Sequence, residues 1–240
     1  MHFRVVAKLQ HILKNKGFKR YFRNTSWLFV EQGIRMGVGL FVGIWVAKHL
    51  GVDQFGLYSF SLAYVSLFGS IAKLGLDSIV VRNLVREPEK TDAILGTAFW
   101  LKVLGACLMM IIISMSMAVS NNDAATKLLI YIIAFSAIFQ AFEVVDFYFH
   151  SKVLAKFVSL SKLFQLVISS IIKIYLILNN ADLIYFVIVF SLDQLVLAIT
   201  LYVVYRLQQN RNFYKCFNFR IAKMMLRDSW PLIFSSGVLM

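Results

Sequence analysis

The sequence predicts an all-α polytopic transmembrane helix bundle, with six full spans and the start of a seventh. Sixty per cent of the 240 residues are hydrophobic and the mean hydropathy is +0.73, whereas soluble domains contain about 45 to 50 per cent apolar residues. The chain has only two prolines, so its apolar stretches are long and uninterrupted. About 20 apolar residues in a helix are enough to cross the roughly 30 Å hydrocarbon layer.

The first 25 residues are predicted to form a basic amphipathic segment on the cytoplasmic side. Residues 1–24 contain seven Lys or Arg and no acid, with apolar residues interleaved at helical spacing. Such a segment suits the surface of the anionic cytoplasmic leaflet. A cleavable signal peptide is not expected, because the basic region is long and no small-residue cleavage site follows it.

A six-helix transmembrane lobe is predicted over residues 26–205. A basic cytoplasmic linker, 206–228, follows, and residues 229–240 are expected to be the truncated start of a seventh span. The six spans predicted from the apolar stretches are Ser26–Lys48, Gly56–Val80, Ala93–Val119, Lys127–Phe149, Phe157–Leu178 and Leu183–Tyr205.

The connectors between the spans predict the orientation of the bundle. Residues 1–24, 81–92, 150–156 and 206–228 would lie on one side and contain eighteen Lys or Arg, against only Lys48 and Lys127 on the other. An excess of basic residues marks the cytoplasmic side. We therefore expect a cytoplasmic N-terminus. The opposite connectors are too short to hold a folded extramembrane site.

The stretch Leu50–Lys90 is predicted to be the first helical hairpin. It opens with a glycine-bounded turn from Gly51 to Gly56, and a continuous helix is expected from Gly56 to Val85. At 1.5 Å per residue this helix would be about 45 Å long and would protrude from the membrane. Lys73 and Asp77 would then lie one turn apart near its cytoplasmic end.

Charged residues within the predicted spans are the candidate functional residues, because each costs about 2.5 to 3.5 kcal/mol to insert at mid-membrane. Glu31 and Arg35, like Lys73 and Asp77, are four residues apart and share a helix face. Each pair is either a self-neutralising structural ion pair or a polar stripe along a water-filled cavity. The charged residues near the cytoplasmic ends of their spans have interface anchoring as an alternative role. This group is Glu31, Lys73, Asp77, Glu143, Asp146 and Lys162.

Arg35, Lys102, Lys173 and Asp193 lie deeper and are the stronger functional candidates. The bases fall mostly on odd-numbered spans, and their convergence on one lumen would favour an anionic substrate such as a pyrophosphate. The predicted substrate-binding residues are Arg35, Lys73, Lys102 and Lys173, and the predicted ion-coupling or gating residues are Glu31, Asp77 and Asp193.

Several other functions are not supported by the sequence. It has no metal-ligand cluster, no nucleophile with a plausible partner and no Gly-x-x-x-x-Gly-Lys-Ser/Thr run for ATP phosphates. Neither a cofactor nor a metal is therefore expected. The net charge of +13 arises between apolar spans and indicates membrane orientation rather than nucleic-acid binding.

Particular residues resemble a known family. Leu50–Tyr58, Lys73–Asp77, Val81-Arg82 and Arg86–Lys90 are similar to the first hairpin of the polysaccharide-export (O-antigen, Wzx-type) flippases of the multidrug/oligosaccharidyl-lipid/polysaccharide exporter superfamily. Asp146–Lys152 and Ser161-Lys162 resemble that family's junction between spans four and five. The resemblance extends over essentially the whole chain, as the N-terminal lobe of a two-lobed flippase.

The resemblance implies a function in the bacterial inner membrane. Members move undecaprenyl-diphosphate-linked oligosaccharides from the cytoplasmic to the periplasmic leaflet by alternating access. The expected partners are this lipid-linked oligosaccharide, membrane lipids, glycan polymerase and chain-length regulator proteins. Because the sequence stops within span seven, a fragment that is inactive alone is expected. The resemblance also implies that the chain is not an enzyme.

Besides a purely structural membrane scaffold, two alternatives remain open from the sequence. One is a multidrug/cation antiporter of the same fold, whose cavity would favour acids over the bases seen here. The other is a membrane glycan polymerase, which should carry a sizeable periplasmic loop with catalytic residues.

Overall fold

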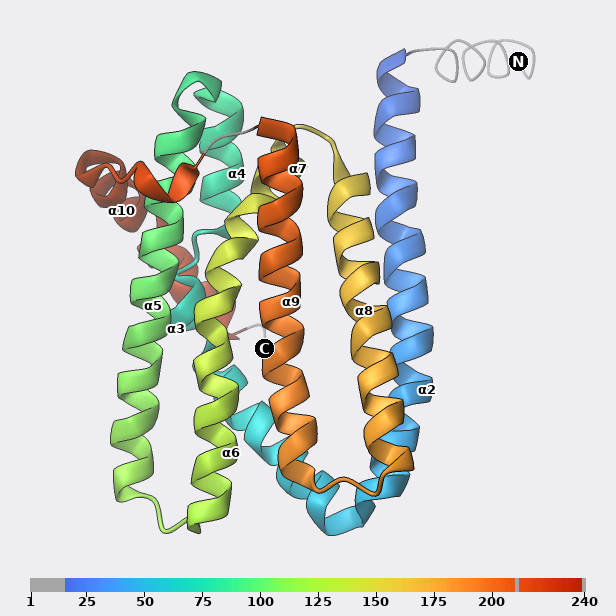
Figure 1. The fold of residues 1–240 in the computed structure, drawn as a ribbon. Coiled ribbons are helices and arrows are strands. Elements are labelled where there is room, and N and C mark those ends of the chain that lie inside the picture. The colour runs from blue at the N-terminus through green and yellow to red at the C-terminus, as the bar shows by residue number, and fades with distance from the viewer. Residues whose placement is uncertain (1–15, 210–211, 239–240) are drawn as a thin grey trace, which may run out of the picture.

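The computed structural model confirms the all-α bundle. It describes residues 16–209 and 212–238, with side chains for 22–209 and 212–229. Within these residues there is no β-strand, and five helices are long and apolar enough to cross a membrane. They lie side by side along a common direction (Figure 1). The predicted segment 1–25 lies largely outside the described residues.

Nine α-helices and three short 3₁₀ helices make up the described chain. In order they are α2 Lys16–Leu67, α3 Gly69–Lys73, α4 Asp77–Arg86, η1 Pro88–Lys90, α5 Thr91–Val119, α6 Ala124–Phe135, η2 Ser136–Glu143, α7 Val144–Ser151, α8 Ala155–Leu178, α9 Leu183–Gln209, η3 Phe213–Lys215 and α10 Phe219–Val238.

The first two predicted spans share the bent helix α2. The expected turn from Gly51 to Gly56 is wrong, because only Gly51 leaves helical geometry, with φ 71° and ψ 178°. Glycine adopts this positive φ without a steric penalty, so one residue is enough to redirect the helix. The chain runs down the first half of α2 and returns through its second half, α3 and α4 (Figure 1).

The continuous helix expected from Gly56 to Val85 is also wrong. The helix ends at Leu67, and after the short α3 the residues Leu74 and Gly75 adopt positive φ values of 52° and 61°. Helix α3 packs closely against α5 at this break. A Cβ on Gly105 of α5 would lie 2.7 Å from the Ala72 carbonyl oxygen. The break separates Lys73 from Asp77, so the two do not share a helix face.

Two hydrophobic clusters form the core. One joins α4, α5, α7 and the end of α9 around Leu84, Leu95, Phe149 and Tyr205. The other joins α2, α5, α6 and α9 nearer the opposite end of the bundle, around Met109, Ile130 and Phe186.

At the start of α6, the Thr126 hydroxyl donates a hydrogen bond to the carboxylate of Asp123. This bond holds the pKa of that exposed carboxyl below its usual range.

The predicted linker 206–228 packs closely against the lobe. Phe213 is fully buried and meets Phe99 and Tyr205 edge to face. The Trp100 indole donates to the Tyr214 carbonyl at 2.9 Å, and the Asn218 amide donates to the Thr97 hydroxyl at 3.0 Å. The linker therefore includes a strap, residues 213–218, that fixes where α10 begins. Helix α10 itself runs through the boundary expected at Ser229.

Substituting Gly96 with alanine should weaken this strap. A Cβ at Gly96 would overlap the carbonyl oxygens of Phe213 and Cys216, so the backbone must shift to accommodate it. We expect Gly96→Ala to lower the free energy of unfolding by about 1 to 3 kcal/mol, typical of overpacking. Thermal unfolding in detergent micelles measures this effect.

Gly33→Ala in α2 is the matched control. Nothing lies within 4 Å of a Cβ there, so the better helix propensity of alanine should be neutral or stabilising by up to about 1 kcal/mol. Equal behaviour of the two variants would contradict a tightly docked strap.

Candidate functional site

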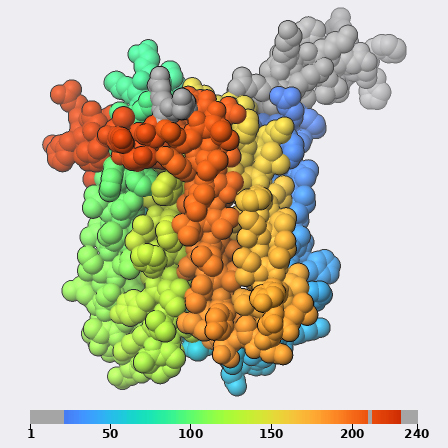
Figure 2. All heavy atoms as spheres, in the orientation of Figure 1, coloured from blue at the N-terminus to red at the C-terminus, as the bar shows by residue number. Residues whose placement is uncertain are grey.

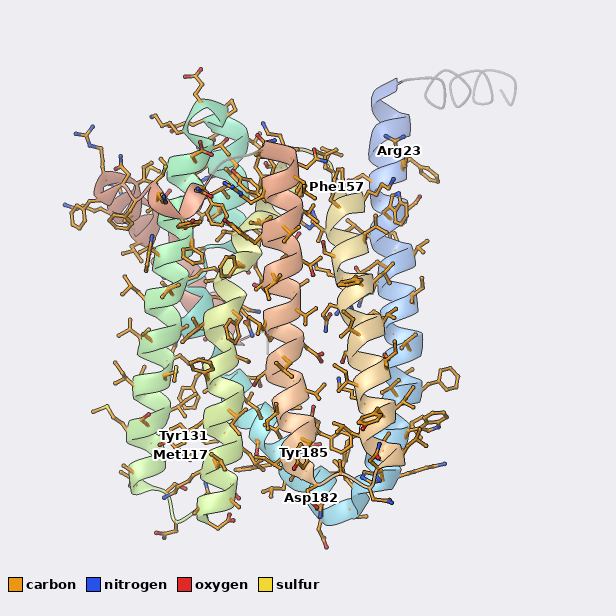
Figure 3. All side chains as sticks on the ribbon, viewed as in Figure 1. Arg23, Met117, Tyr131, Phe157, Asp182 and Tyr185 are labelled. Carbon is orange, nitrogen blue, oxygen red and sulfur yellow. The ribbon has the colours of Figure 1, made fainter. Side chains whose placement is uncertain are left out.

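Most of the charged residues inside the helices of the bundle form ion pairs, at separate places along it. Figure 3 labels Arg23 and Phe157 near one end of the bundle and Asp182 and Tyr185 near the other, and the long helices run between these two ends. Unpaired charges are costly at this depth. The pairs therefore define the candidate site.

Lys102 is the most buried of the bases within the apolar helices and the centre of a three-residue charged cluster. Its side chain is only 3% exposed and lies on α5, about 17 Å beyond the start of that helix at 1.5 Å per residue. The Nζ atom donates to Glu143 Oε2 at 3.2 Å and lies 3.3 Å from Asp77 Oδ1. It also lies 4.7 Å from the centre of the Phe147 ring. Lys102 thus links α4, α5 and the end of η2.

The second buried pair joins α8 to α9. Lys173 Nζ donates to Asp193 Oδ2 at 3.1 Å, and the buried Ser169 hydroxyl donates to the same oxygen at 2.7 Å. Asp193 lies about 15 Å from the start of α9, well inside this apolar helix. The lysine and serine line a pocket of about 130 Å³ whose other wall includes Gly39 and Gly43 of α2. The pocket thus lies between the charged pair and two glycines of α2.

Glu31 and Arg35 form the ion pair expected from their spacing. Arg35 Nε lies 2.7 Å from Glu31 Oε1 on the same face of α2. The glutamate is buried, whereas the arginine side chain is 35% exposed. One guanidinium nitrogen, Nη2, is buried without a hydrogen-bond partner in the described part of the chain. The arginine therefore retains an unused donor.

Lys73 and Asp77 do not pair, which corrects the expectation of a self-neutralising pair. Asp77 turns to Lys102, and no carboxylate of the described residues lies within ion-pair distance of Lys73. Lys73 instead lines a pocket of about 170 Å³ between α2, α3, α5 and η2, together with Ser66, Ser136 and Gln140. Three polar side chains and an uncompensated cation thus lie in the wall of an otherwise mostly apolar pocket.

A further cluster lies where α7 meets α8. Lys162 Nζ is 2.9 Å from Asp146 Oδ2, and His150 Nε2 is 2.9 Å from Asp146 Oδ1. Interface anchoring is one of the roles expected for Asp146 and Lys162 from the sequence, and the structure shows that this pair also joins α7 to α8.

Five bases lie within the predicted spans, and four of them pair with carboxylates at separate places: Arg35, Lys102, Lys162 and Lys173. The convergence of these bases on one lumen stays a prediction, and Lys73 is the one of the five without a carboxylate partner among the described residues. Sequence reasoning missed Ser169, Ser136 and Gln140. The 3₁₀ geometry of η2, which presents Ser136, Gln140 and Glu143, has no signal in the apolar pattern. No group of three metal-ligating side chains occurs in the part of the chain described.

Comparison with known proteins gives one match. A family model described as polysaccharide biosynthesis protein matches residues 21–239. No curated protein and no solved structure matches the chain.

Proposed function

Because the chain belongs to the polysaccharide biosynthesis protein family over residues 21–239, we propose that it moves an undecaprenyl-diphosphate-linked oligosaccharide across a bacterial inner membrane. The family connects the chain to polysaccharide synthesis or export, and the five apolar helices make it a membrane protein. Translocation of the lipid-linked substrate by alternating access is the step that we add.

The observation that carries this proposal is the position of the charged groups. Lys102, Lys173 and Asp193 lie within apolar helices, whereas the connectors 120–123 and 179–182 are short. Charges kept inside a membrane bundle are typical of transport pathways and costly without such a use. A polymerase would instead use a large extramembrane loop.

In this proposal the bases contact the diphosphate and sugar. Lys73 and Lys173 are the best placed, since both line pockets, and Arg35 and Lys102 complete the set. The acids Glu31, Asp77 and Asp193 would couple movement to an ion gradient, because they can exchange their base partner for a proton or cation. The N-terminus and the basic connectors lie in the cytoplasm in this scheme.

Deleting the gene tests the proposal in cells. We expect surface polysaccharide to disappear and single lipid-linked repeat units to accumulate in the cytoplasmic leaflet, measured by their resistance to a glycosidase added outside. Expression of the protein from a plasmid should restore both.

The alternatives give different results. Loss of a polymerase would leave single repeat units exposed on the outer side, and loss of a drug antiporter would change drug sensitivity while polysaccharide remained normal. Either result would contradict the proposal.

A further inference from the structure

Helix α10 has two distinct long faces in its first three turns. One face carries Ala222, Met225 and Ser229, all buried against the lobe. The ion pair between Arg82 of α4 and Asp228 holds this face in place. The strap 213–218 fixes the start of the helix. The orientation of α10 on the lobe is thus set by contacts on one side.

The other face is divided into an apolar band and a basic band. At about 100° per residue, Phe219 and Leu226 lie about 40° to 60° around the helix from Ala222. They are 76% and 40% exposed. Arg220, Lys223 and Arg227, all exposed, lie further around, at about 100° to 160°. Two large apolar side chains therefore adjoin three cations on a surface that the lobe leaves uncovered.

These cations have little compensation from the chain itself. Among the described residues no carboxylate lies within ion-pair distance of Arg220 or Lys223, and Arg227 reaches Asp228 only at 4.0 Å, in a contact that is 82% exposed on the arginine side. Lys215 and Phe217 are exposed just before the helix. Residues 215–217 thus place an exposed cation beside an exposed aromatic ring just before α10, as the exposed face of α10 also does.

The position of α10 suits a flat partner at the end of the bundle. Figures 1 and 2 show the start of α10 projecting sideways from the bundle, beside α5 and at the end that carries α4. That end is the one predicted to be cytoplasmic. A helix that projects sideways at this level lies over the lipid that surrounds the bundle.

We propose that the face of α10 formed by Phe219, Leu226, Arg220, Lys223 and Arg227 lies against anionic phospholipid. The apolar band would enter the boundary between headgroups and acyl chains while the basic band contacts phosphate groups, as in interfacial amphipathic helices. An acidic protein partner would not need an apolar band beside the cations. The proposal does not depend on which substrate the protein transports.

A fluorescent probe at Leu226 tests this inference in the whole protein. Cys107 and Cys216 are changed to serine, Leu226→Cys is labelled with an apolar fluorophore, and the protein is placed in nanodiscs. The discs contain phosphatidylcholine, with or without phosphatidylglycerol, and brominated acyl chains as quenchers. We expect quenching with phosphatidylglycerol, and much less with phosphatidylcholine alone or at high salt.

The charge of the basic band should control this quenching. Each basic residue at an anionic surface contributes about fivefold to partitioning, so the triple variant Arg220→Gln, Lys223→Gln and Arg227→Gln should shift the bound-to-free ratio by about a hundredfold. Arg220→Lys with Arg227→Lys keeps the charge and should keep the quenching. The matched control, Lys48→Gln with Lys127→Gln at the other end, should also leave it unchanged.

Three outcomes would overturn the inference. They are wild-type quenching in the triple variant, equal quenching in both types of disc, and an unquenched probe in phosphatidylglycerol discs. The last would mean that water or a protein partner covers this face. Gel filtration and the Lys-for-Arg variant separate loss of lipid contact from loss of folding.

Discussion

Replacing Lys102 with methionine should destabilise the lobe more than any other single change at the charged residues. The substitution leaves Asp77 and Glu143 without their shared cation, and breaking a buried ion pair in this way costs about 3 to 5 kcal/mol. Because these carboxylates are 46% and 30% exposed, water can solvate them partly, and we expect about 3 kcal/mol, the lower end of that range. Chemical unfolding in micelles measures the loss.

The matched control is Lys90→Met. Lys90 pairs with Glu87, and both side chains are largely exposed, so its loss should change stability by less than about 1 kcal/mol. Adding Asp77→Asn and Glu143→Gln to Lys102→Met should recover much of the lost stability, because the acids no longer need a cation. Equal stability of Lys102→Met and Lys90→Met would contradict the cluster's structural role.

Replacing Lys173 with alanine should abolish surface polysaccharide while the protein remains in the membrane. The change leaves the Ser169 hydroxyl as the one side-chain hydrogen-bond donor to Asp193 among the described residues, and it removes the cation from the pocket beside α2. The measurement is surface polysaccharide per unit of membrane-inserted protein, with Lys48→Ala as the control.

Exchanging the two charges distinguishes a transport role from a structural one. The variant Lys173→Asp with Asp193→Lys keeps an ion pair across α8 and α9, so stability should return. The cation then lies on α9 and no longer in its native place in the pocket, so polysaccharide export should stay low. Full export by the exchanged variant would show that the pair only stabilises the helices.

Apolar stretches predicted the helices well, because membrane spans must satisfy their backbone hydrogen bonds internally. The spacing of Glu31 and Arg35 predicted their pair, since contacts four residues apart are local. In contrast, Lys102 meets Glu143 across 41 residues, and only the packing of α5 against η2 creates that contact.

The break before Asp77 shows a second limit of the sequence. Gly75 indicated that a positive φ was permitted, but Leu74 adopts one as well, which leucine does only where packing enforces it. Contact of α3 with Gly105 supplies that packing. The burial of Phe213 was missed for a similar reason, because a basic stretch with single aromatics is typical of an exposed connector.

Reconstitution of the purified full-length protein that includes these 240 residues, together with a lipid-linked oligosaccharide, is the most direct test of the proposed translocation. The fraction of oligosaccharide that becomes accessible to a membrane-impermeant glycosidase is followed over time. We expect accessibility to rise faster than in protein-free vesicles, and Lys173→Ala to reduce the rate to the protein-free value. A wild-type rate equal to that of protein-free vesicles would contradict the proposal.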